Sequence, residues 1–268
     1  MGGAVTRVDL RYGAATDVGL VREVNEDAHL AAPPVFVVAD GMGGHDHGEV
    51  ASAYVVEEFA RLAEEGFDAD SAADAVAETL AAVHTRIDAY DAAHHAAGEL
   101  LFGSGTTAVV AVLVSDVAEP YWLLANLGDS RGYRFAGSEL TQVTVDHSLV
   151  QELVDDGTID AADAATHPDS HIVTRALGGP VRYRPDLFVV PAEVSGRILL
   201  CSDGVSGMLA HDDIARILGE HQEPGAAADA VVAAAVAAGG RDNATAVIVD
   251  VVGLARQTSS RQETGAHP

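Results

Sequence analysis

The stretch Val35-Phe36-Val37-Val38-Ala39-Asp40-Gly41-Met42-Gly43-Gly44 decides the fold of this chain. Its first five residues are apolar and include no glycine or proline. An uninterrupted apolar run of this length predicts a buried strand, which would deliver Asp40 at its end. An Asp-Gly pair after a strand is often only a turn, so this stretch alone leaves both a turn and a functional site open.

Two further stretches repeat this design of an apolar run that leads to an aspartate. They are Tyr121-Trp122-Leu123-Leu124-Ala125-Asn126-Leu127-Gly128-Asp129-Ser130 and Arg197-Ile198-Leu199-Leu200-Cys201-Ser202-Asp203-Gly204. The recurrence favours a shared site over three unrelated turns. The sequence therefore predicts that three apolar strands converge and bring together the carboxylates of Asp40, Asp129 and Asp203.

Length and composition predict one large core. The chain has 268 residues, of which 48% are hydrophobic. This is enough for a single domain with a substantial buried interior. Because no linker divides the chain, we expect one domain over residues 1–254. The polar residues 255–268 have no core to join, and we expect them to form a disordered tail.

The charge of the chain excludes some classes of partner. The formal net charge is −26, and all 15 cationic side chains are arginines. Such a surface repels nucleic-acid phosphates and anionic lipids, so we expect neither as a partner. The single cysteine, Cys201, excludes an internal disulfide and predicts a packing role. Without a membrane-length apolar segment or a signal-peptide pattern, we expect a cytoplasmic protein.

Patterns of apolar residues predict a layered α+β fold. Alanine-rich stretches without proline predict two helices early in the chain, and shorter helical patterns occur near its end. Consecutive strands with short connections suggest an antiparallel meander in the middle. The predicted helices are 48–65, 71–97, 212–218 and 224–238, and the predicted strands are 5–14, 35–40, 106–114, 121–127, 132–135, 187–190, 198–201 and 244–252.

Residues 146–185 do not follow these patterns. They are polar, lack sustained periodicity and include His147, His167 and His171. A long irregular stretch inside a compact domain is often functional, so we expect a mobile flap here.

The segment 21–27 carries Arg22 and three acidic residues between strands. It could be a solvated hairpin. Alternatively, Arg22 binds a phosphate group, for which a planar guanidinium is suited, and Glu26 or Asp27 lies beside a metal ion. The nearby pair His45 and His47 allows either a metal site or an ordinary exposed loop.

If Glu26, Asp40, Asp203 and Asp242 meet at one place, either some of them are protonated or cations lie among them, because the chain has no lysine to neutralise them. Two divalent ions would balance four carboxylates, and oxygen ligands select magnesium, manganese or calcium over zinc. A pair of such ions can activate a water for attack on phosphorus. We find no convincing Ser-His-Asp or Cys-His arrangement, which favours a metal-dependent phosphohydrolase.

Six segments, in this order, resemble the motifs of bacterial PPM-type (type 2C) metal-dependent serine/threonine protein phosphatases. The resemblance extends from about Arg11 to Val252. The segments are Thr16–Asp27, Ala39–Gly44, Gly103–Thr107, Leu127–Arg131, Cys201–Gly204 and Gly240–Asn243.

This resemblance implies a four-layer αββα sandwich of two antiparallel sheets flanked by helices. It also implies two Mn²⁺ or Mg²⁺ ions per subunit and a weaker third ion. Arg22, Asp40 and Asp203 would be catalytic, with Arg22 on the substrate phosphate. Asp40 would bridge the two ions, and the remaining ligands would be the Gly41 carbonyl and Glu26 for one ion, Asp203 and Asp242 for the other, and Asp129 with Asp203 for the third.

Two residues depart from the pattern of the family. Many eukaryotic relatives have a histidine, proposed as a general acid, where this chain has Met42. Either His45 or a metal-bound water would then donate the proton, or the leaving group departs unaided. His171 occupies a flap position where similar bacterial enzymes tend to have a small polar residue near the third ion.

The resemblance predicts that phosphorylated proteins are substrates, that the enzyme opposes serine/threonine kinases, and that it is a monomer. Two alternatives stay open. One is a phosphatase dedicated to an anti-sigma-factor antagonist, which shares this fold, although the absence of an added sensor domain favours the general enzyme. The other is a catalytically dead module that binds phosphoproteins, against which the presence of all four metal carboxylates argues.

Overall fold

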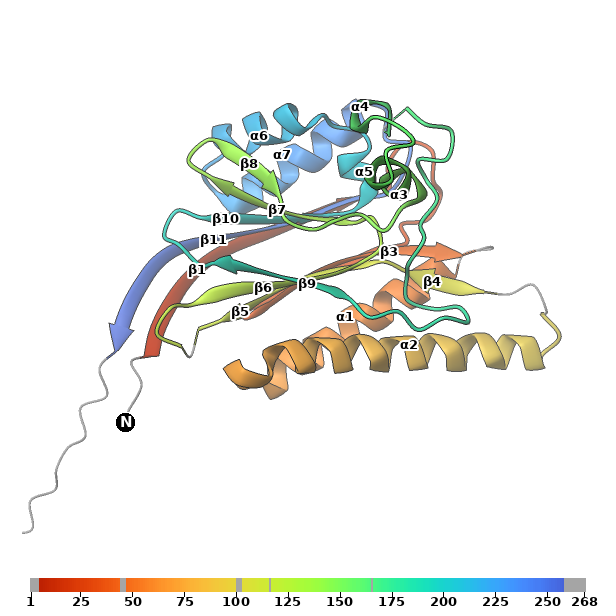
Figure 1. Ribbon diagram of the computed structural model, residues 1–268, viewed down its shortest axis with the longest axis horizontal. Coiled ribbons are helices and arrows are strands. Elements are labelled where there is room, and N and C mark those ends of the chain that lie inside the picture. The colour runs from red at the N-terminus through yellow and green to blue at the C-terminus, as the bar shows by residue number, and fades with distance from the viewer. Residues whose placement is uncertain (1–4, 44–46, 100–102, 116, 165, 258–268) are drawn as a thin grey trace, which may run out of the picture.

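Two antiparallel β-sheets lie face to face, and helices cover their outer surfaces (Figure 1). The computed structural model describes residues 5–43, 47–99, 103–115, 117–164 and 166–257. Sheet A has the order β1 (Val5–Asp17), β11 (Ala244–Gln257), β10 (Arg197–Cys201), β7 (Arg131–Ala136) and β8 (Glu139–Gln142). Sheet B has the order β2 (Asp27–Ala32), β3 (Val35–Gly43), β5 (Ala108–Val114), β6 (Tyr121–Leu127) and β9 (Asp186–Pro191), with β4 (Ser104–Thr106) paired to the end of β3.

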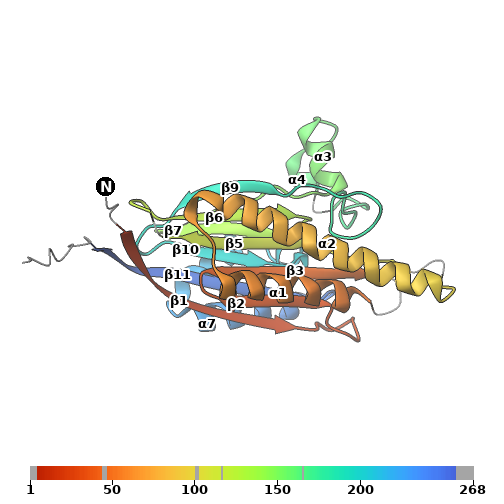
Figure 2. The ribbon, with the colours of Figure 1, turned by 90° about the horizontal axis from the view of Figure 1, so that it is seen from below.

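Two pairs of helices form the outer layers. The helices α1 (Gly48–Glu65) and α2 (Ala72–Ala96), linked by the 3₁₀ turn Ala69–Ser71, cover sheet B (Figure 2). The helices α6 (His211–Glu220) and α7 (Pro224–Ala237) cover sheet A. The shorter helices α3 (Leu149–Asp155), α4 (Ala161–Ala164) and α5 (Asp203–Ser206) lie at the end of the sandwich toward which β3 points. The four-layer αββα prediction is confirmed.

The strand β3 explains why the opening apolar run has no polar interruption. Alternate side chains of a strand point to opposite faces. Val35 and Val37 belong to the cluster under α1 and α2, whereas Phe36 and Val38 pack between the two sheets. All four are 0% exposed, and full burial of each such side chain contributes about 1.5–3 kcal/mol. This strand is therefore held firmly from both faces.

The predicted meander over residues 106–135 is wrong. The strands β5 and β6 form an antiparallel hairpin in sheet B, but the chain then crosses to sheet A, where β7 pairs with β10 and β8. The other edge of β6 in sheet B pairs with β9, which comes much later in the sequence. A run of short connections could not reveal this change of sheet, because it depends on long-range pairing.

The segment 146–185 has more regular structure than the sequence predicted. It begins with α3, where the Ser148 side chain accepts a hydrogen bond from the Gln151 N–H at 3.3 Å. A serine before an apolar helical turn is a recognised start signal that the polar composition obscured. Beyond α4, residues 166–185 form no helix or longer strand.

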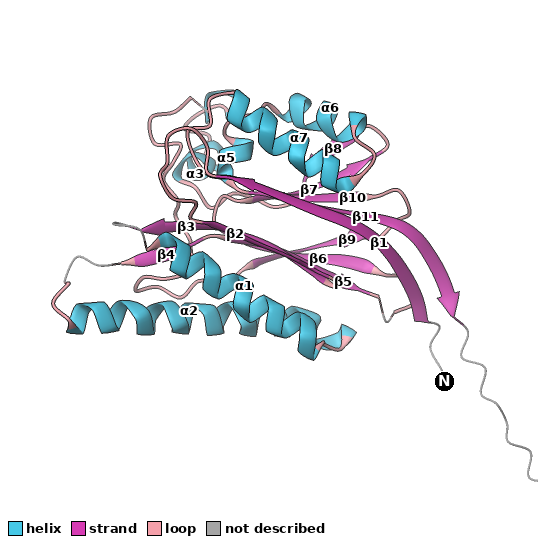
Figure 3. Cartoon of the chain, turned by 180° about the vertical axis from the view of Figure 1, so that it is seen from behind, coloured by secondary structure: helices cyan, strands magenta, loops and turns pink. Residues whose placement is uncertain are grey.

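The last strand also differs from the prediction. The strands β1 and β11 pair over their whole length and extend past their neighbours at one end of the sandwich (Figure 3). Residues 255–257, predicted as tail, pair with Val5, Thr6 and Arg7. The predicted boundary after residue 254 is therefore too early, and residues 258–268 lie outside the described part of the chain.

In the parts that the structure describes, no helix combines the length and apolar character needed to cross a membrane.

Candidate active site

Asp40 lies inside an extended strand and not at a turn. The strand β3 continues through Gly43, with Gly41 opposite Thr106 and Gly43 opposite Ser104 of β4. A Cβ at residue 41 would lie 2.3 Å from the Gly48 carbonyl oxygen and 2.5 Å from the Glu26 carbonyl oxygen. Glycine at this position therefore lets β2, β3 and the start of α1 meet beside Asp40. The alternative of a simple Asp-Gly turn is excluded.

Two threonines that sequence reasoning quoted without a role fix the backbone of Asp40. The Asp40 N–H donates to Thr107 Oγ1 at 3.0 Å, and the Asp40 carbonyl accepts from the Thr107 N–H and from Thr106 Oγ1, both at 2.9 Å. Thr107 Oγ1 also lies 2.7 Å from Ser130 Oγ, next to Asp129. The Thr106-Thr107 pair thus connects the strand that carries Asp40 with the turn that carries Asp129.

The strand β2 brings two more acidic residues to Asp40. Asp27 pairs directly with Asp40 across the antiparallel strands. Its Oδ2 accepts a hydrogen bond from Ser202 Oγ at 2.8 Å, while its Oδ1 is buried and has no hydrogen-bond partner among the described residues. Glu26 Oε1 accepts from the Gly48 N–H at 3.0 Å, at the N-terminus of α1, where a negative charge is favourable.

Asp203 follows β10 as the first residue of α5 and faces Asp40. The Asp40 and Asp203 carboxyl groups lie close enough for each to change the pKa of the other. Asp203 Oδ1 is buried and lacks a hydrogen-bond partner within the described residues. Asp242, just before β11, instead accepts a hydrogen bond from Arg22 at 2.8 Å between Nη2 and Oδ2. Asp40 and Asp203 are thus buried at the centre of the group, whereas Asp242 at its edge is paired with Arg22.

Asp129 completes the predicted convergence at the crossover between the sheets. It is 8% exposed and lies close enough to Asp40 and Asp203 for its charge to affect theirs. Burial, together with the charges of Asp203 and Asp146, raises the pKa of Asp129 to about 7. The three strands therefore do bring together the three carboxylates that the sequence singled out.

Burial and mutual repulsion raise the pKa values of this cluster. Burial raises the pKa of Asp27 to about 7, and the charges of Asp203 and Asp242 add to the rise. For Asp40, burial and the charges of Asp27, Asp203 and Asp129 raise the pKa well above its usual value. Burial likewise raises the pKa of Asp203. Such groups must hold protons or cations at neutral pH.

The residues present fit a pair of hard divalent cations. The donors are all oxygens, and two of them, Asp27 Oδ1 and Asp203 Oδ1, are buried without a partner in the described structure. Within the described ranges, no three His, Cys, Asp or Glu side chains are already arranged around one point as metal ligands. The Arg22–Asp242 hydrogen bond uses a carboxylate oxygen that a bound cation would take.

The loop that carries Arg22 is organised by Asn243, a residue to which the sequence assigned no role. Asn243 is 5% exposed; its Nδ2 donates to the Val18 and Val24 carbonyls at 2.9 and 3.0 Å, and its Oδ1 accepts from the Glu26 N–H at 2.8 Å. An asparagine beside Asp242 was visible in the sequence, but its partners lie more than two hundred positions earlier. The Arg22 side chain itself is 50% exposed.

Met42 and His47 follow Asp40 in the chain. Met42 pairs with Gly105 in the β3–β4 ladder. His47 precedes α1, and its ring lies 5.5 Å from that of His94 and 6.3 Å from that of Tyr90, centroid to centroid. His45, the candidate proton donor, lies outside the described residues, as does Asp46.

His171 is exposed, and among the described contacts no hydrogen bond or ion pair joins it to Asp129 or Asp203. The neighbouring Ile172 carbonyl accepts from the Leu149 N–H at 2.9 Å, so the backbone next to His171 is attached to the start of α3. A role for His171 at a third ion stays a prediction.

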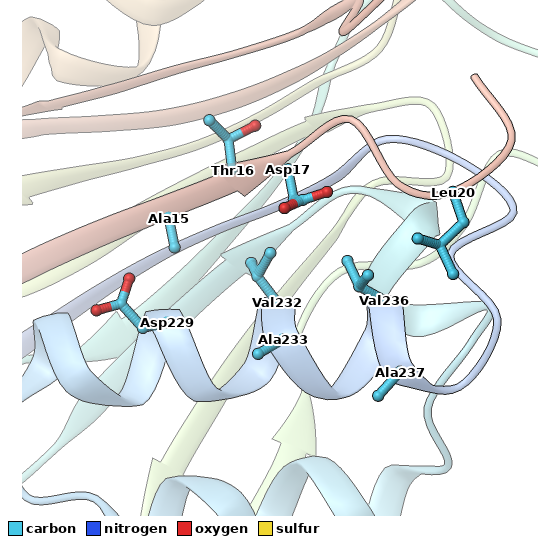
Figure 4. Close-up of a pocket in the computed structure, with 9 residues that line it drawn as sticks. All are labelled: Ala15, Thr16, Asp17, Leu20, Asp229, Val232, Ala233, Val236 and Ala237. Atoms are coloured by element: carbon cyan, nitrogen blue, oxygen red, sulfur yellow. The ribbon is translucent and has the colours of Figure 1, made fainter. Parts of the chain in front are cut away.

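A cavity of about 450 Å³ lies between β1 and α7, next to the Arg22 loop (Figure 4). Leu20 lies at one end of it, and the Leu20 N–H donates to the Gly240 carbonyl at 2.7 Å. Its lining is largely aliphatic, with Asp17 and Asp229 as the charged members. None of the clustered carboxylates lines it, so this cavity is separate from the candidate active site.

Comparisons with known proteins agree with this geometry. The family model described as Protein phosphatase 2C matches residues 21–239. The serine/threonine protein phosphatase PstP of Mycobacterium tuberculosis is 38% identical over 243 residues, which cover 91% of this chain but 45% of that protein. This chain therefore spans less than half the length of that relative.

Other relatives match over nearly their whole length. The serine/threonine phosphatase stp of Listeria monocytogenes is 37% identical over 244 residues, which cover 88% of this chain and 93% of that protein. A crystal structure of the PstP catalytic domain in complex with two manganese ions has a TM-score of 0.79 and 35% identity, and covers 92% of this chain and 100% of that one. With the family model across most of its length, this chain belongs to the protein phosphatase 2C family.

Proposed function

We propose that this chain is a metal-dependent protein phosphatase that hydrolyses phosphoserine and phosphothreonine in proteins. The observation that carries the proposal is the buried cluster of Asp27, Asp40, Asp129 and Asp203, in which two carboxylate oxygens have no partner among the described residues. Maintaining such a cluster is costly unless it binds cations. The phosphatase names of the relatives and the two manganese ions of the PstP structure support the same conclusion.

The ligand roles are those that the resemblance of the motifs implies. Asp40 would hold both ions, the Gly41 carbonyl and Glu26 one of them, and Asp203 and Asp242 the other. Two bound Mn²⁺ or Mg²⁺ ions would supply a water nucleophile at neutral pH and charge to neutralise the phosphate oxygens. The hydrogen bonds of Thr106 and Thr107 hold the Asp40 backbone, which keeps its carboxylate aimed at the centre of the cluster.

Arg22 would bind the substrate phosphate. Its guanidinium is half-exposed and is held at the edge of the cluster by Asp242. A planar guanidinium can donate two parallel hydrogen bonds to a phosphate, so Arg22 would be suited to bind phosphate oxygens in place of Asp242. The Asn243 contacts fix the loop from which Arg22 projects.

Several finer features belong to the same proposal. We infer a cytoplasmic monomer that acts on phosphorylated proteins and opposes serine/threonine kinases, with a third ion held by Asp129 and Asp203. A phosphatase dedicated to an anti-sigma-factor antagonist is not favoured, because the matched relatives bear the names of general serine/threonine phosphatases. A dead binding module is not favoured, because Asp40, Asp203 and Asp242 are all present at the cluster.

The test is hydrolysis of a phosphothreonine peptide by the purified chain, with manganese, with magnesium and with excess chelator. We expect turnover that depends on the added ion and is insensitive to thiol reagents, because the single cysteine, Cys201, is buried in β10. A matched phosphotyrosine peptide is the specificity control. Full activity in excess chelator would refute the proposal.

A further inference from the structure

The buried imidazole of His147 lies directly behind the Asp129 turn and has no part in the mechanism above. His147 is 3% exposed and follows Asp146, at the start of the segment that the sequence identified as a flap. Each of its two ring nitrogens faces a different part of the molecule. One contacts the turn that carries Asp129, and the other contacts Asp186 at the start of β9, just after the flap segment.

The Nδ1 side of the ring fixes the turn that carries Asp129. His147 Nδ1 accepts a hydrogen bond from the Gly128 N–H at 3.1 Å, and the His147 N–H donates to the Gly128 carbonyl at 2.9 Å. Asn126 Nδ2 donates to the same carbonyl at 3.0 Å. Gly128 has φ +114°, and a Cβ there would lie 2.5 Å from the Thr107 side chain. Both peptide groups of Gly128 are therefore fixed immediately before Asp129.

The contact with Gly128 also determines the tautomer. Because Nδ1 accepts a hydrogen bond, it carries the lone pair, and the ring hydrogen is on Nε2. Nε2 then donates to Asp186 Oδ2 at 3.0 Å. Arg175 Nη1 lies 3.4 Å from Asp186 Oδ1 and 3.4 Å from His147 Nε2. Since Nη1 and Nε2 are both donors, the favourable contact of Arg175 is the one with Asp186.

The backbone of His147 joins the same two regions. The Thr174 N–H donates to the His147 carbonyl at 2.8 Å, and the Leu149 N–H donates to the Ile172 carbonyl at 2.9 Å. These bonds attach residues 172–174 to residues 147–149. His147 is thus the shared contact of the Asp129 turn, the flap residues 172–175 and Asp186 at the start of β9.

We propose that His147 is a positioning residue that couples the flap residues 172–175 to the direction of the Asp129 carboxylate and so sets the affinity of the third ion. This inference rests on the proposed function. An ion held by two carboxylates and otherwise by water is sensitive to the direction of each ligand, because few ligands constrain it. Partners that orient a metal ligand typically change the affinity for the metal by about 10–100-fold when they are removed.

Two substitutions separate the two sides of the ring. The amide oxygen of Asn in His147→Asn can replace Nδ1 as the acceptor for the Gly128 N–H, but its short side chain loses Asp186. The longer side chain of His147→Gln can reach Asp186 from the position of Nε2, but it loses the acceptor for Gly128. If His147 were purely structural, both substitutions would lower the stability of the protein by a similar amount. If His147 is a positioning residue, His147→Gln should weaken manganese binding more than His147→Asn does.

The measurement is manganese binding by titration calorimetry, alongside thermal unfolding in chelator. We expect His147→Gln to weaken the lowest-affinity manganese phase about tenfold, and His147→Asn to weaken it by about twofold or less, with the tighter phases unchanged in both. Equal effects of the two variants on that phase, or no effect of His147→Gln, would overturn the inference.

A second variant keeps the inference testable if both His147 variants fail to fold. Asp186 is half-exposed, and Asp186→Ala removes the acceptor that orients Nε2. We expect a weakening of the lowest-affinity phase of about threefold, compared with the exposed control Asp70→Ala. Identical isotherms for these two variants would contradict the coupling.

The wild-type isotherm separates this inference from the proposed function. A wild-type isotherm that has only tight phases would overturn this inference and leave the two-ion function intact. No manganese binding at all would refute the proposed function itself.

Discussion

The strand ends that carry Asp40 and Asp203 and the neighbouring segment 146–185 are stabilised in different ways. The residues before Asp40 and Asp203 are fully buried between a second sheet and a helical layer. Within the segment 146–185, no described residue between Val150 and Leu177 is buried, and the chain is held there by backbone bonds and by contacts of half-exposed residues such as that of Arg175 with Asp186. Regions with few buried apolar contacts open more easily than core strands. In the proposed phosphatase, the core would therefore position the carboxylates, and the segment 146–185 would adjust them.

The largest expected effect tests the core half of this comparison. Asp40→Asn should lower kcat by about three orders of magnitude, because the ions and the water act as a unit. The variant resembles the protonated carboxyl that burial favours, so its thermal stability in chelator should equal or exceed that of the wild type at pH 8. Phosphopeptide turnover and thermal unfolding measure the two effects. Near-normal turnover would show that the site lies elsewhere.

The strand ends that carry Asp40 and Asp203 were also the part of the molecule that could be predicted from the sequence. The run from Val35 to Ala39 has a simple pattern because both of its faces are buried, and burial leaves a direct record in residue type. The aspartates that follow such runs could therefore be placed at one end of the sandwich.

The rest depended on contacts between residues far apart in the sequence. Asn243 bonds to Val18, Val24 and Glu26, and His147 bonds to Gly128 and Asp186. A single polar residue does not indicate which distant backbone group it will meet. For the same reason the crossover from β6 to β7 was missed, since the pairing of β7 with β10 is set by a strand that comes much later.

A smaller effect is expected at the edge of the cluster. Arg22→Ala should raise KM for small phosphate esters about tenfold with a smaller fall in kcat, because a phosphate-binding arginine acts in both the ground and the transition state. Arg216→Ala, an exposed arginine on α6, is the matched control. If KM is unchanged and only stability falls, the role of Arg22 is the ion pair with Asp242.

The pH dependence of stability tests whether cations replace protons in the core cluster. The pKa values of Asp27 and Asp129 are raised to about 7, so these groups hold protons in the folded chain at a pH where the unfolded chain has lost them. Their contribution is fully present below the unfolded pKa of about 4 and is lost as the pH rises through about 7. In chelator, the melting temperature should therefore fall between pH 5 and pH 8.

Manganese should reverse this loss, so the increase in melting temperature that it causes should be larger at pH 8 than at pH 6. Each proton retained on folding contributes a slope of up to about 1.4 kcal/mol per pH unit. Asp27→Asn keeps a partner for Ser202 and removes one titrating group, so its slope in chelator should be shallower. A melting temperature in chelator that is independent of pH would show that these carboxyls are not protonated in the folded chain.

The smallest expected effect comes from the segment 146–185, and it tests whether a side chain of this segment changes the affinity for an ion. His171 is exposed, but it is adjacent to Ile172, whose carbonyl is bonded to the Leu149 N–H beside His147. An imidazole there could accept a hydrogen bond from water around a third ion. His171→Ser should therefore change the lowest-affinity manganese phase by about threefold. Activity measured against manganese concentration, with exposed His95→Ser as the control, tests this change. If His171→Ser gives the same curves as the wild type and as the control, the segment acts on Asp129 through the backbone bonds around His147 and not through the side chain of His171.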